Sequence, residues 1–336
     1  MRICYVADGR YVHSHRWMRY FSALGHKLYF LSFQPMEPAH IAAVEETGAR
    51  YLGELGPFHI KRFWRTLADL TRLKRVLRSE RIEVLHCHFL GVNTWYAALS
   101  NFHPFVITVM GGDVCGPGWK PQGRREQLLT PFALRQADLI TCWSNTMSKV
   151  VREFSPASTP LAVIHGGIDT ARFCPGARPA YLLERWSLPI NAKVIFSPRL
   201  MRPLYNLDKI AQAAMIIGAA CENAYFVFAY PPDVSNAEYE AKVKMIVARS
   251  AVAERVRFVG AIPHAEMPDY YRLADVTVSV PSTDGTPMSV LESMACETPV
   301  VVSAIPDYDP EYIEPGKTVL AASAADNEAI AAAICA

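Results

Sequence analysis

Short apolar runs along the chain alternate with longer stretches in which apolar residues recur at helical spacing. Residues 2–7, RICYVA, contain β-branched and aromatic residues and are apolar after the first position, which predicts a strand. Apolar residues then recur at helical spacing from Trp17 and stop at Gly25, and a second strand is predicted over 28–33. An order of strand, helix and strand indicates a βαβ unit, the start of a parallel sheet.

The same alternation continues along the rest of the chain. Further strands are predicted over 84–88, 105–110, 137–141, 161–165, 193–197, 224–230, 256–259 and 274–280. Further helices are predicted over 237–249, 267–273 and 288–296, and from about 327. A chain of 336 residues exceeds what one hydrophobic core usually serves, and a stretch rich in Gly and Pro separates two sets of strands. We therefore expect two α/β domains, residues 1–170 and 192–336, joined by a linker over 171–191.

One predicted helix, over residues 60–81, is strongly basic. Its apolar residues form a stripe that we expect to be buried: Phe63, Leu67, Leu70, Leu73 and Leu77. Its cations crowd the remainder: Lys61, Arg62, Arg65, Arg72, Lys74, Arg75, Arg78 and Arg81. Such a helix can lie on an anionic membrane surface, and a solvated helix on a domain is the alternative. Residues 1–180 carry a net charge of +9 and residues 181–336 of −7, which favours an anionic partner for the first half unless the asymmetry is accidental.

The composition is that of an ordinary globular protein and excludes several classes. No apolar run reaches the roughly 18 residues of a membrane span, and the opening MRICYVAD becomes polar too early for a signal peptide. The eight cysteines stand singly, which argues against a zinc site and a disulfide framework and favours a reducing cytosol. His86, Cys87 and His88 are neighbours on a predicted strand, where side chains alternate between faces, so they cannot easily bind one metal ion.

The most informative stretch, residues 280–303, reads VPSTDGTPMSVLESMACETPVVVS. Proline ends the preceding strand at position 281. Thr286 then occupies a position typical of an N-cap and Pro287 the first helical position, so a helix is predicted to begin directly after a strand. The unpaired backbone N–H groups at Met288 and Ser289 and the positive end of the helix dipole indicate an anion site suited to a phosphate.

Two carboxylates flank this junction. Asp284 lies in the loop before the helix and Glu292 about two turns into it, with seven residues between them. Together they could accept hydrogen bonds from two hydroxyl-bearing parts of one ligand while the helix dipole holds its phosphates. A nucleotide sugar fits that description. The alternative is that Asp284 is a turn residue before Gly285 and that Glu292 lies on a solvated helix face.

The stretch resembles the signature of two acids seven residues apart in the family-four retaining glycosyltransferases. The resemblance rests on the strand, Pro-Ser, Asp-Gly, Leu-Glu-Ser-Met-Ala and Thr-Pro-Val-Val in that order. It implies that Asp284, beside Gly285 and Thr286, contacts the sugar hydroxyls and that Glu292 holds the ribose. It also implies a GT-B fold, two Rossmann-like domains of doubly wound parallel sheets that face a central cleft. Glu297 departs from the pattern because relatives end this helix with a glycine.

Other donor-side residues follow from the same resemblance. Arg199, after the strand over 193–197, matches an arginine that grips the donor diphosphate, a task that suits the planar fork of a guanidinium. Relatives add a lysine five residues later, where this chain has Leu204 and Tyr205, and Arg202 is the nearby cation that could replace it. A surface ion pair is the alternative for Arg202. The turn made by Gly260, Ala261 and Ile262 is expected to present its backbone to the nucleobase.

The acceptor side is expected in the first domain. The resemblance points to the turn at Gly9 and Arg10, although relatives have paired glycines there. Met110 stands where relatives carry a histidine near the reacting sugar, and Asp113 is retained as an acceptor-side candidate unless it only caps its loop. His86 and His88, at the carboxyl end of a predicted parallel strand, are acceptor-side candidates by position, with core histidines as the alternative.

The expected function is transfer of a sugar from a nucleotide-sugar donor to an acceptor hydroxyl, with retention and without a metal ion or other cofactor. The acceptor would be a sugar or a lipid-linked sugar, the location the cytoplasm or the inner face of the membrane, and no nucleic acid would be involved. A sugar-nucleotide epimerase of the same fold and a noncatalytic binding subunit are the alternatives. Relatives continue through a helix that returns to the first domain, so we expect either a truncated chain or a compact variant.

Overall fold

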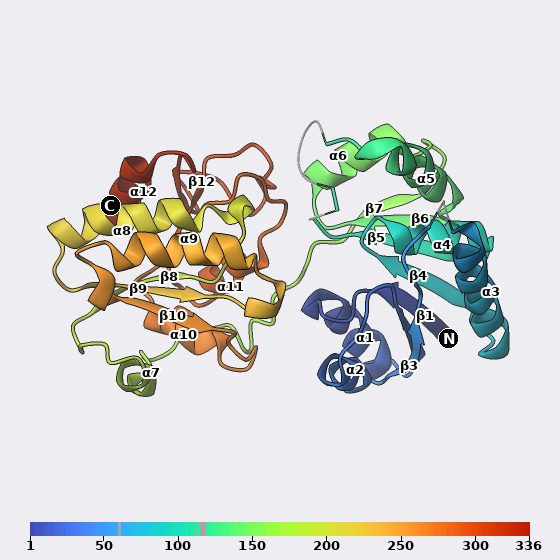
Figure 1. Ribbon diagram of the computed structural model, residues 1–336, viewed down its shortest axis with the longest axis horizontal. Coiled ribbons are helices and arrows are strands. Elements are labelled where there is room, and N and C mark those ends of the chain that lie inside the picture. Colours follow the sequence, from blue (N-terminus) through green and yellow to red (C-terminus); the bar gives the residue numbers. More distant parts are fainter. Residues whose placement is uncertain (60–61, 112, 115–118) are drawn as a thin grey trace. The chain divides into compact units, whose positions relative to one another are not determined.

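The chain divides into two compact units, Met1–His165 and Gly166–Ala336. The computed structural model describes residues 1–59, 62–111, 113–114 and 119–336 (Figure 1). The predictions made for Ile60, Lys61, Gly112 and Cys115 therefore lie outside the described residues. Among the described residues, no helix has the length and apolar character needed to cross a bilayer.

The first unit is built on a parallel sheet with the strand order β3-β2-β1-β4-β5-β6-β7. Its strands are β1 (Arg2–Ala7), β2 (Lys27–Ser32), β3 (Ala49–Glu54), β4 (Val84–His88), β5 (Phe105–Val109), β6 (Leu139–Cys142) and β7 (Leu161–Val163). Its helices are α1 (Val12–Ala23), α2 (Pro38–Glu45), α3 (Phe63–Ser79), α4 (Val92–Ser100), α5 (Gly123–Gln136) and α6 (Asn145–Phe154). The predicted βαβ start is confirmed, because β1 and β2 pair in parallel on either side of α1 in the chain.

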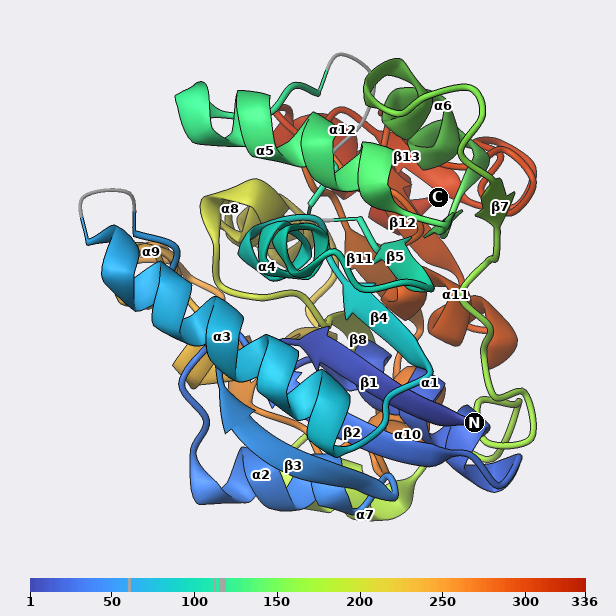
Figure 2. The same cartoon turned by 90° about the vertical axis from the view of Figure 1, so that its right-hand side faces the viewer.

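Helices cover both faces of this sheet. Met18 of α1 and Val44 of α2 pack against Tyr5 and other apolar residues of β1 and β2. On the other face, α4 contacts β1, β4 and β5, and α3 and α5 lie against α4 (Figure 2). Residues of β1 alternate between the two faces and almost all are buried, which is typical of a strand in a doubly wound sheet.

The buried stripe predicted for α3 is partly wrong. Leu73 and Leu77 are buried, whereas Phe63 and Leu67 are 65% and 55% exposed. The buried face instead includes Thr66, whose hydroxyl donates to the backbone carbonyl of His59 and accepts from its N–H. The side of the helix that faces the unit is therefore the one that carries Thr66, Leu73 and Leu77, and Phe63 and Leu67 point outward.

The second unit repeats the plan, with the strand order β10-β9-β8-β11-β12-β13. Its strands are β8 (Lys193–Ser197), β9 (Ala224–Ala229), β10 (Val256–Gly260), β11 (Val276–Ser279), β12 (Val300–Ser303) and β13 (Leu320–Ala322). Its helices are α7 (Ala180–Arg185), α8 (Leu207–Ala220), α9 (Ala237–Ala248), α10 (Met267–Leu273), α11 (Met288–Ala295) and α12 (Asn327–Cys335). Short 3₁₀ turns lie at Pro203–Tyr205, Pro232–Val234 and Ala253–Arg255. The predicted linker, residues 171–191, contains α7.

Two apolar clusters sandwich the second sheet. One joins α8, α9 and α12 to the face that carries Ile195 and Phe226, and the other joins α7 and α10 to the face that carries Val194 and Phe196 (Figure 1). In both sheets the strand order runs outward in both directions from a central pair, as in Rossmann-like folds. The prediction of two doubly wound α/β units is therefore confirmed.

Candidate donor site in the second unit

The point where the strand order reverses in the second sheet lies between β8 and β11, which pair directly. In open α/β sheets, ligands bind beyond the carboxyl ends of the strands at this point. The loop after β8 begins at Pro198 and carries Arg199, and the loop after β11 carries Asp284 and leads into α11. The fold thus brings the two main donor-side predictions to the same edge of one sheet.

Arg199 is the centre of this edge. Its Nη2 donates to Oδ2 of Asp284 at 2.5 Å and its Nη1 donates to Oγ of Ser289 at 3.1 Å. Its Cζ lies 4.2 Å from the centre of the Tyr205 ring, in cation–π geometry. Burial alone would lower the pKa of Arg199, but Asp284 together with Tyr205 and Tyr308 outweighs this effect, and the pKa is raised. The guanidinium is therefore a fixed positive charge with a defined orientation.

Tyr205 was noted in the sequence only because a lysine is absent there. In the structure it lies under the guanidinium of Arg199, on the 3₁₀ turn that follows β8. A second tyrosine, Tyr308, is buried and close enough to Asp284 to feel its charge. Burial and the Asp284 carboxylate both raise the pKa of Tyr308. No local pattern in the sequence could have assigned either ring to the site.

The loops after β8 and β11 are fixed to each other by hydrogen bonds. The side-chain amide of Asn206 donates to the Val280 carbonyl at 2.9 Å and to Oγ of Ser282 at 3.0 Å. The backbone N–H of Ser282 donates to the Leu204 carbonyl at 2.8 Å. These bonds hold Arg199 and Asp284 in register, which favours a preorganised site over one assembled by a ligand.

The helix α11 begins at Met288, as predicted, but its N-cap is Pro287 and not Thr286. Proline fixes the backbone angle of the cap and the cap forms no side-chain hydrogen bond. Thr286 is buried one residue earlier. The N-terminus of α11 therefore presents backbone N–H groups of Met288 and Ser289 beside Arg199, the combination that suits an anion.

The end of α11 confirms the expected strain. Glu297 has φ of +59°, in the left-handed region. Its N–H donates to the Met294 carbonyl, and the Thr298 N–H donates to the Ser293 carbonyl. This pair of bonds is a Schellman motif, in which glycine is the favoured residue at position 297.

Glu292, the second acid of the signature, is buried on α11. Its Oε2 accepts a hydrogen bond from the Tyr271 hydroxyl at 3.1 Å. Burial and the neighbouring carboxylate raise the pKa of Tyr271, so this phenol stays a donor. The geometry does not match the alternative of a solvated helix face.

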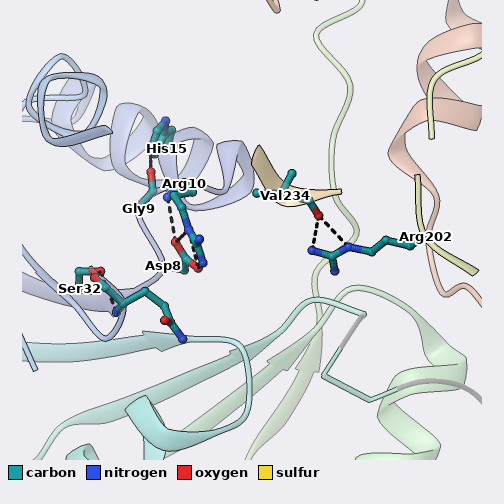
Figure 3. Close-up of polar contacts among 8 residues, drawn as sticks. Asp8, Gly9, Arg10, His15, Ser32, Arg202 and Val234 are labelled. Atoms are coloured by element: carbon teal, nitrogen blue, oxygen red, sulfur yellow. Dashed lines mark hydrogen bonds and ion pairs between the residues drawn. The ribbon is translucent and has the colours of Figure 1, made fainter. Parts of the chain in front are cut away.

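The other donor-side predictions lie elsewhere in the second unit. Arg202 donates from Nε at 2.8 Å and from Nη2 at 2.5 Å to the carbonyl of Val234, which does not match a surface ion pair (Figure 3). The guanidinium of Arg202 therefore joins the loop after β8 to the 3₁₀ turn that follows β9. Gly260 has φ of +67°, which favours glycine, and its carbonyl accepts from the N–H of Tyr230. Ala261 is exposed and Ile262 half-buried in the turn after it.

In the first unit, the turn after β1 is closed by its own side chains. Arg10 forms a bidentate ion pair with Asp8, at 2.9 Å from Nε to Oδ1 and 2.6 Å from Nη2 to Oδ2 (Figure 3). His15 Nε2 lies 2.8 Å from the Gly9 carbonyl. A Cβ on Gly9 would come within 2.4 Å of the terminal methyl of Met36, so a larger residue here would have to displace that side chain.

His86 and His88 form one buried polar cluster at the carboxyl end of β4. Nε2 of His86 lies 2.6 Å from the Thr108 hydroxyl, and Nδ1 of His88 lies 2.9 Å from the Ser14 hydroxyl. The two imidazole rings are 4.5 Å apart, and each lies about 5 Å from the Tyr5 ring. Burial lowers the pKa of His86 to about 3 and that of His88 well below its ordinary value.

The carboxylate of Asp113 accepts hydrogen bonds from backbone N–H groups: Leu90 at 2.7 Å on Oδ2, and Met110 at 3.2 Å and Gly111 at 2.9 Å on Oδ1. Burial raises the pKa of Asp113 despite these bonds. The carboxylate thus joins the loops after β4 and β5. Its assignment to the acceptor side stays a prediction.

Within the described ranges, no three His, Cys, Asp or Glu side chains are grouped so that they could hold a metal ion. The positive groups of the donor-site edge are Arg199 and the start of α11.

Comparisons with known proteins agree with this architecture. Residues 8–172 match the family described as Glycosyltransferase Family 4, and residues 191–336 match the family described as Glycosyl transferases group 1. The chain is 31% identical over 251 residues to a D-inositol 3-phosphate glycosyltransferase of Mycolicibacterium gilvum, which covers 68% of this chain and 54% of that protein. A protein of the same name from Salinispora tropica is 24% identical over 257 residues, 71% of this chain and 53% of its own. The chain spans about half the length of the curated relatives it matches.

Solved structures show the same fold. Sucrose-phosphate synthase from Thermosynechococcus elongatus aligns with a TM-score of 0.78 at 18% identity, over 100% of this chain and 89% of that chain. Anabaena Alr3699/HepE in complex with UDP-glucose aligns with a TM-score of 0.81 at 14% identity, over the same shares.

Proposed function

Because the chain belongs to the family-four, group 1 glycosyltransferases, we propose that it transfers a sugar from a nucleotide-sugar donor to an acceptor hydroxyl, with retention at the anomeric carbon. The observation that carries the proposal is the position of Arg199. Its guanidinium contacts Ser289 at the start of α11, so one edge of the sheet combines a fixed cation with a helix N-terminus. Both favour a dianionic diphosphate.

The chemistry assigned to these groups is stabilisation of the leaving nucleoside diphosphate. Charge accumulates on the phosphate oxygens as the bond to the anomeric carbon breaks, and preorganised positive groups lower the energy of that state. Arg199 and the α11 N-terminus supply this charge without a metal ion. Asp284 orients the hydroxyls of the donor sugar, and the buried carboxylate of Glu292 accepts from the ribose.

Retention would follow from attack on the face from which the diphosphate departs, with the departing phosphate oxygen accepting the proton of the acceptor hydroxyl. In that scheme the bond from the anomeric carbon to the acceptor oxygen replaces the bond to the phosphate oxygen on the same face. No side chain has to form a covalent intermediate. The acceptor would be a sugar or a lipid-linked sugar, and the site of action the cytoplasm.

A uridine nucleotide is the first donor to test, because the similar HepE structure holds UDP-glucose. A panel should include UDP-glucose, UDP-N-acetylglucosamine, GDP-mannose and ADP-glucose, each screened by thermal shift. A donor that binds the native state raises the melting temperature with the logarithm of its concentration over its dissociation constant. The best donor is then measured by calorimetry, and release of the nucleoside diphosphate is followed with and without sugar acceptors.

The decisive variant is Arg199→Met, matched to Arg249→Met, which removes an exposed arginine of the same unit. Loss of charge-assisted hydrogen bonds should weaken donor binding about 10- to 100-fold in the first and leave it unchanged in the second. Failure of every nucleotide sugar to bind, or equal binding by Arg199→Met, would overturn the donor site. Tight binding with no nucleotide release under any condition would instead favour a noncatalytic binding subunit.

A further inference from the structure

The outer face of α3 changes character along its length. Phe63, Trp64 and Leu67 in its first turns are 65%, 57% and 55% exposed. At 100° per residue, the exposed Arg75 and Arg78 and the half-buried Lys74 lie on the same side of the helix as these apolar residues. One face of one helix therefore carries an aromatic end and a cationic end, about 20 Å apart.

The cationic end forms a shallow hollow. It is lined by Thr71, Lys74, Arg75, Arg78 and Ser79. Among the described residues, no carboxylate lies within ion-pair distance of Lys74, Arg75 or Arg78, although other cations of the unit are paired. Two nearby acids are used elsewhere: Asp69 of α3 accepts from the Tyr96 hydroxyl, and Glu80, the C-cap of α3, pairs with Arg50. The described residues thus leave the positive charge of the hollow without a neutralising carboxylate.

A further exposed apolar residue of the first unit lies on α5. Leu128 is 74% exposed, and Arg124 and Arg125 lie one turn before it and are also exposed. Nη1 of Arg125 lies 3.4 Å from the carbonyl of Phe58, which ties the start of α5 to the segment that leads into α3. Figure 2 shows α3 and α5 on the same side of the first sheet, with α4 between them. Leu128 is therefore a further exposed apolar side chain of this unit, and arginines precede it in the same helix.

We propose that this face of α3 docks onto an anionic lipid bilayer. Phe63, Trp64 and Leu67 would enter the boundary between headgroups and acyl chains, where aromatic side chains are favoured. Lys74, Arg75 and Arg78 would lie among lipid phosphates, to which cations near an anionic surface are attracted. The helix would lie slightly tilted, with its N-terminal end deeper. This assignment concerns a different unit from the donor site and does not depend on sugar transfer.

The pairing of groups favours a bilayer over a soluble anionic partner. A nucleic acid or an acidic protein would use the cations but would leave Phe63, Trp64 and Leu67 in water. A purely apolar protein partner would leave Lys74, Arg75 and Arg78 unpaired at its border. A bilayer with anionic headgroups offers both environments. The acyl boundary and the phosphates differ in depth by no more than one helix width, so a slightly tilted α3 can reach both.

Vesicle binding tests the proposal with the full chain. Sedimentation with vesicles of phosphatidylcholine containing 30% phosphatidylglycerol is compared with pure phosphatidylcholine. The triple variant Lys74→Gln, Arg75→Gln and Arg78→Gln should bind the anionic vesicles about 100-fold more weakly, since each cation contributes roughly fivefold. A matched control neutralises three exposed cations on other elements of the unit, Lys27, Arg135 and Lys149, and should change binding less than threefold.

Tryptophan fluorescence reports the aromatic end. Trp64 is the one exposed tryptophan in the part of the chain that the structure describes. Its emission should shift to the blue on anionic vesicles and be quenched by lipids brominated near the headgroup, and Trp64→Phe should remove both signals. Phe63→Ser with Leu67→Ser should reduce binding at least tenfold without lowering the melting temperature, because both side chains are exposed.

Three results would overturn docking of α3 onto a bilayer. Equal losses in the cation variant and its matched control would show general charge attraction and overturn the docking face. Binding abolished by 20 mM inorganic phosphate, with no fluorescence shift on vesicles, would assign the hollow to a free phosphate. Tight binding with no involvement of Trp64 would exclude insertion of the aromatic end.

Discussion

The guanidinium of Arg199 and the carboxylate of Asp284 are 85 residues apart in the chain and form a 2.5 Å ion pair at one edge of the second sheet. The two groups that the sequence assigned to the diphosphate and to the sugar thus bind each other in the structure. A donor must share or replace this pair. Its diphosphate can then take up the arginine while its sugar hydroxyls donate to the carboxylate.

Asp284→Asn should therefore separate binding from turnover. The amide leaves the arginine charge unneutralised, so UDP without a sugar should bind as tightly as before or a few-fold more tightly. Transfer should fall at least 100-fold, because the amide no longer orients the sugar hydroxyls as a charged acceptor does. Calorimetry with UDP and product assays on the same preparation measure the two effects.

The matched control for this variant is Glu222→Gln, which removes an exposed carboxylate of the same unit. It should change neither quantity. If Asp284→Asn weakens UDP binding as strongly as it slows transfer, the carboxylate serves only to hold the arginine in place, and its assignment to the sugar is wrong.

Tyr205 is expected to act on the donor through Arg199. The ring lies 4.2 Å from the guanidinium carbon, a contact that contributes about 1–2 kcal/mol when partly desolvated. Tyr205→Leu should weaken UDP binding about 5- to 10-fold, because the guanidinium loses one of the groups that orient it. Tyr205→Phe keeps the aromatic face and should stay within twofold of the wild type. Equal losses in both variants would assign the effect to the phenol hydroxyl instead.

The second unit was largely predictable from local patterns. The strand over 193–197 and the helix over 267–273 were predicted with their observed bounds, because short β-branched runs and clear end signals mark them. The helix α8 was not predicted. Its sequence, LDKIAQAAMIIGAA, is apolar on nearly every side, so it shows little periodicity.

Contacts over long sequence separations were not predictable in the same way. The signature identified Arg199 and Asp284 separately, but only the folded sheet shows that they pair. The rotation of α3 was missed for a related reason. Apolar periodicity assigned Phe63 and Leu67 to the buried stripe, whereas in the structure Thr66 lies on the buried side and bonds to the backbone of His59, a contact that apolar periodicity does not register.

The end of α11 offers a stabilising substitution. Glu297 adopts a left-handed conformation that strains a residue with a Cβ, and its backbone bonds complete a Schellman motif. Glu297→Gly should raise the free energy of unfolding by about 0.5–1 kcal/mol, since relief of strain exceeds the added entropy of the unfolded chain. Glu297→Ala keeps the Cβ and should give no such gain. Urea unfolding of the three proteins compares them, and equal stabilities for Gly and Ala would contradict the argument.

The buried histidines predict a loss of stability in acid. His86 and His88 are held neutral in the folded first unit, with the pKa of His86 lowered by burial to about 3. In the unfolded chain a histidine binds a proton below about pH 6.5. The unfolded state therefore binds more protons, and stability falls as the pH drops from about 6.5 toward 3. At about pH 4.5, His86 alone should cost about 2–3 kcal/mol relative to pH 7.

Tryptophan fluorescence during urea unfolding follows this loss, because five of the six tryptophans belong to the first unit. His86→Gln keeps a group that can bond to Thr108 but cannot titrate, so its stability should depend less steeply on pH between about 6.5 and 4.5. His59→Gln, at a half-buried histidine of the same unit, should leave the slope unchanged. A variant at position 86 that is less stable at every pH by the same amount would show that the imidazole contributes packing and hydrogen bonding but does not set the acid sensitivity.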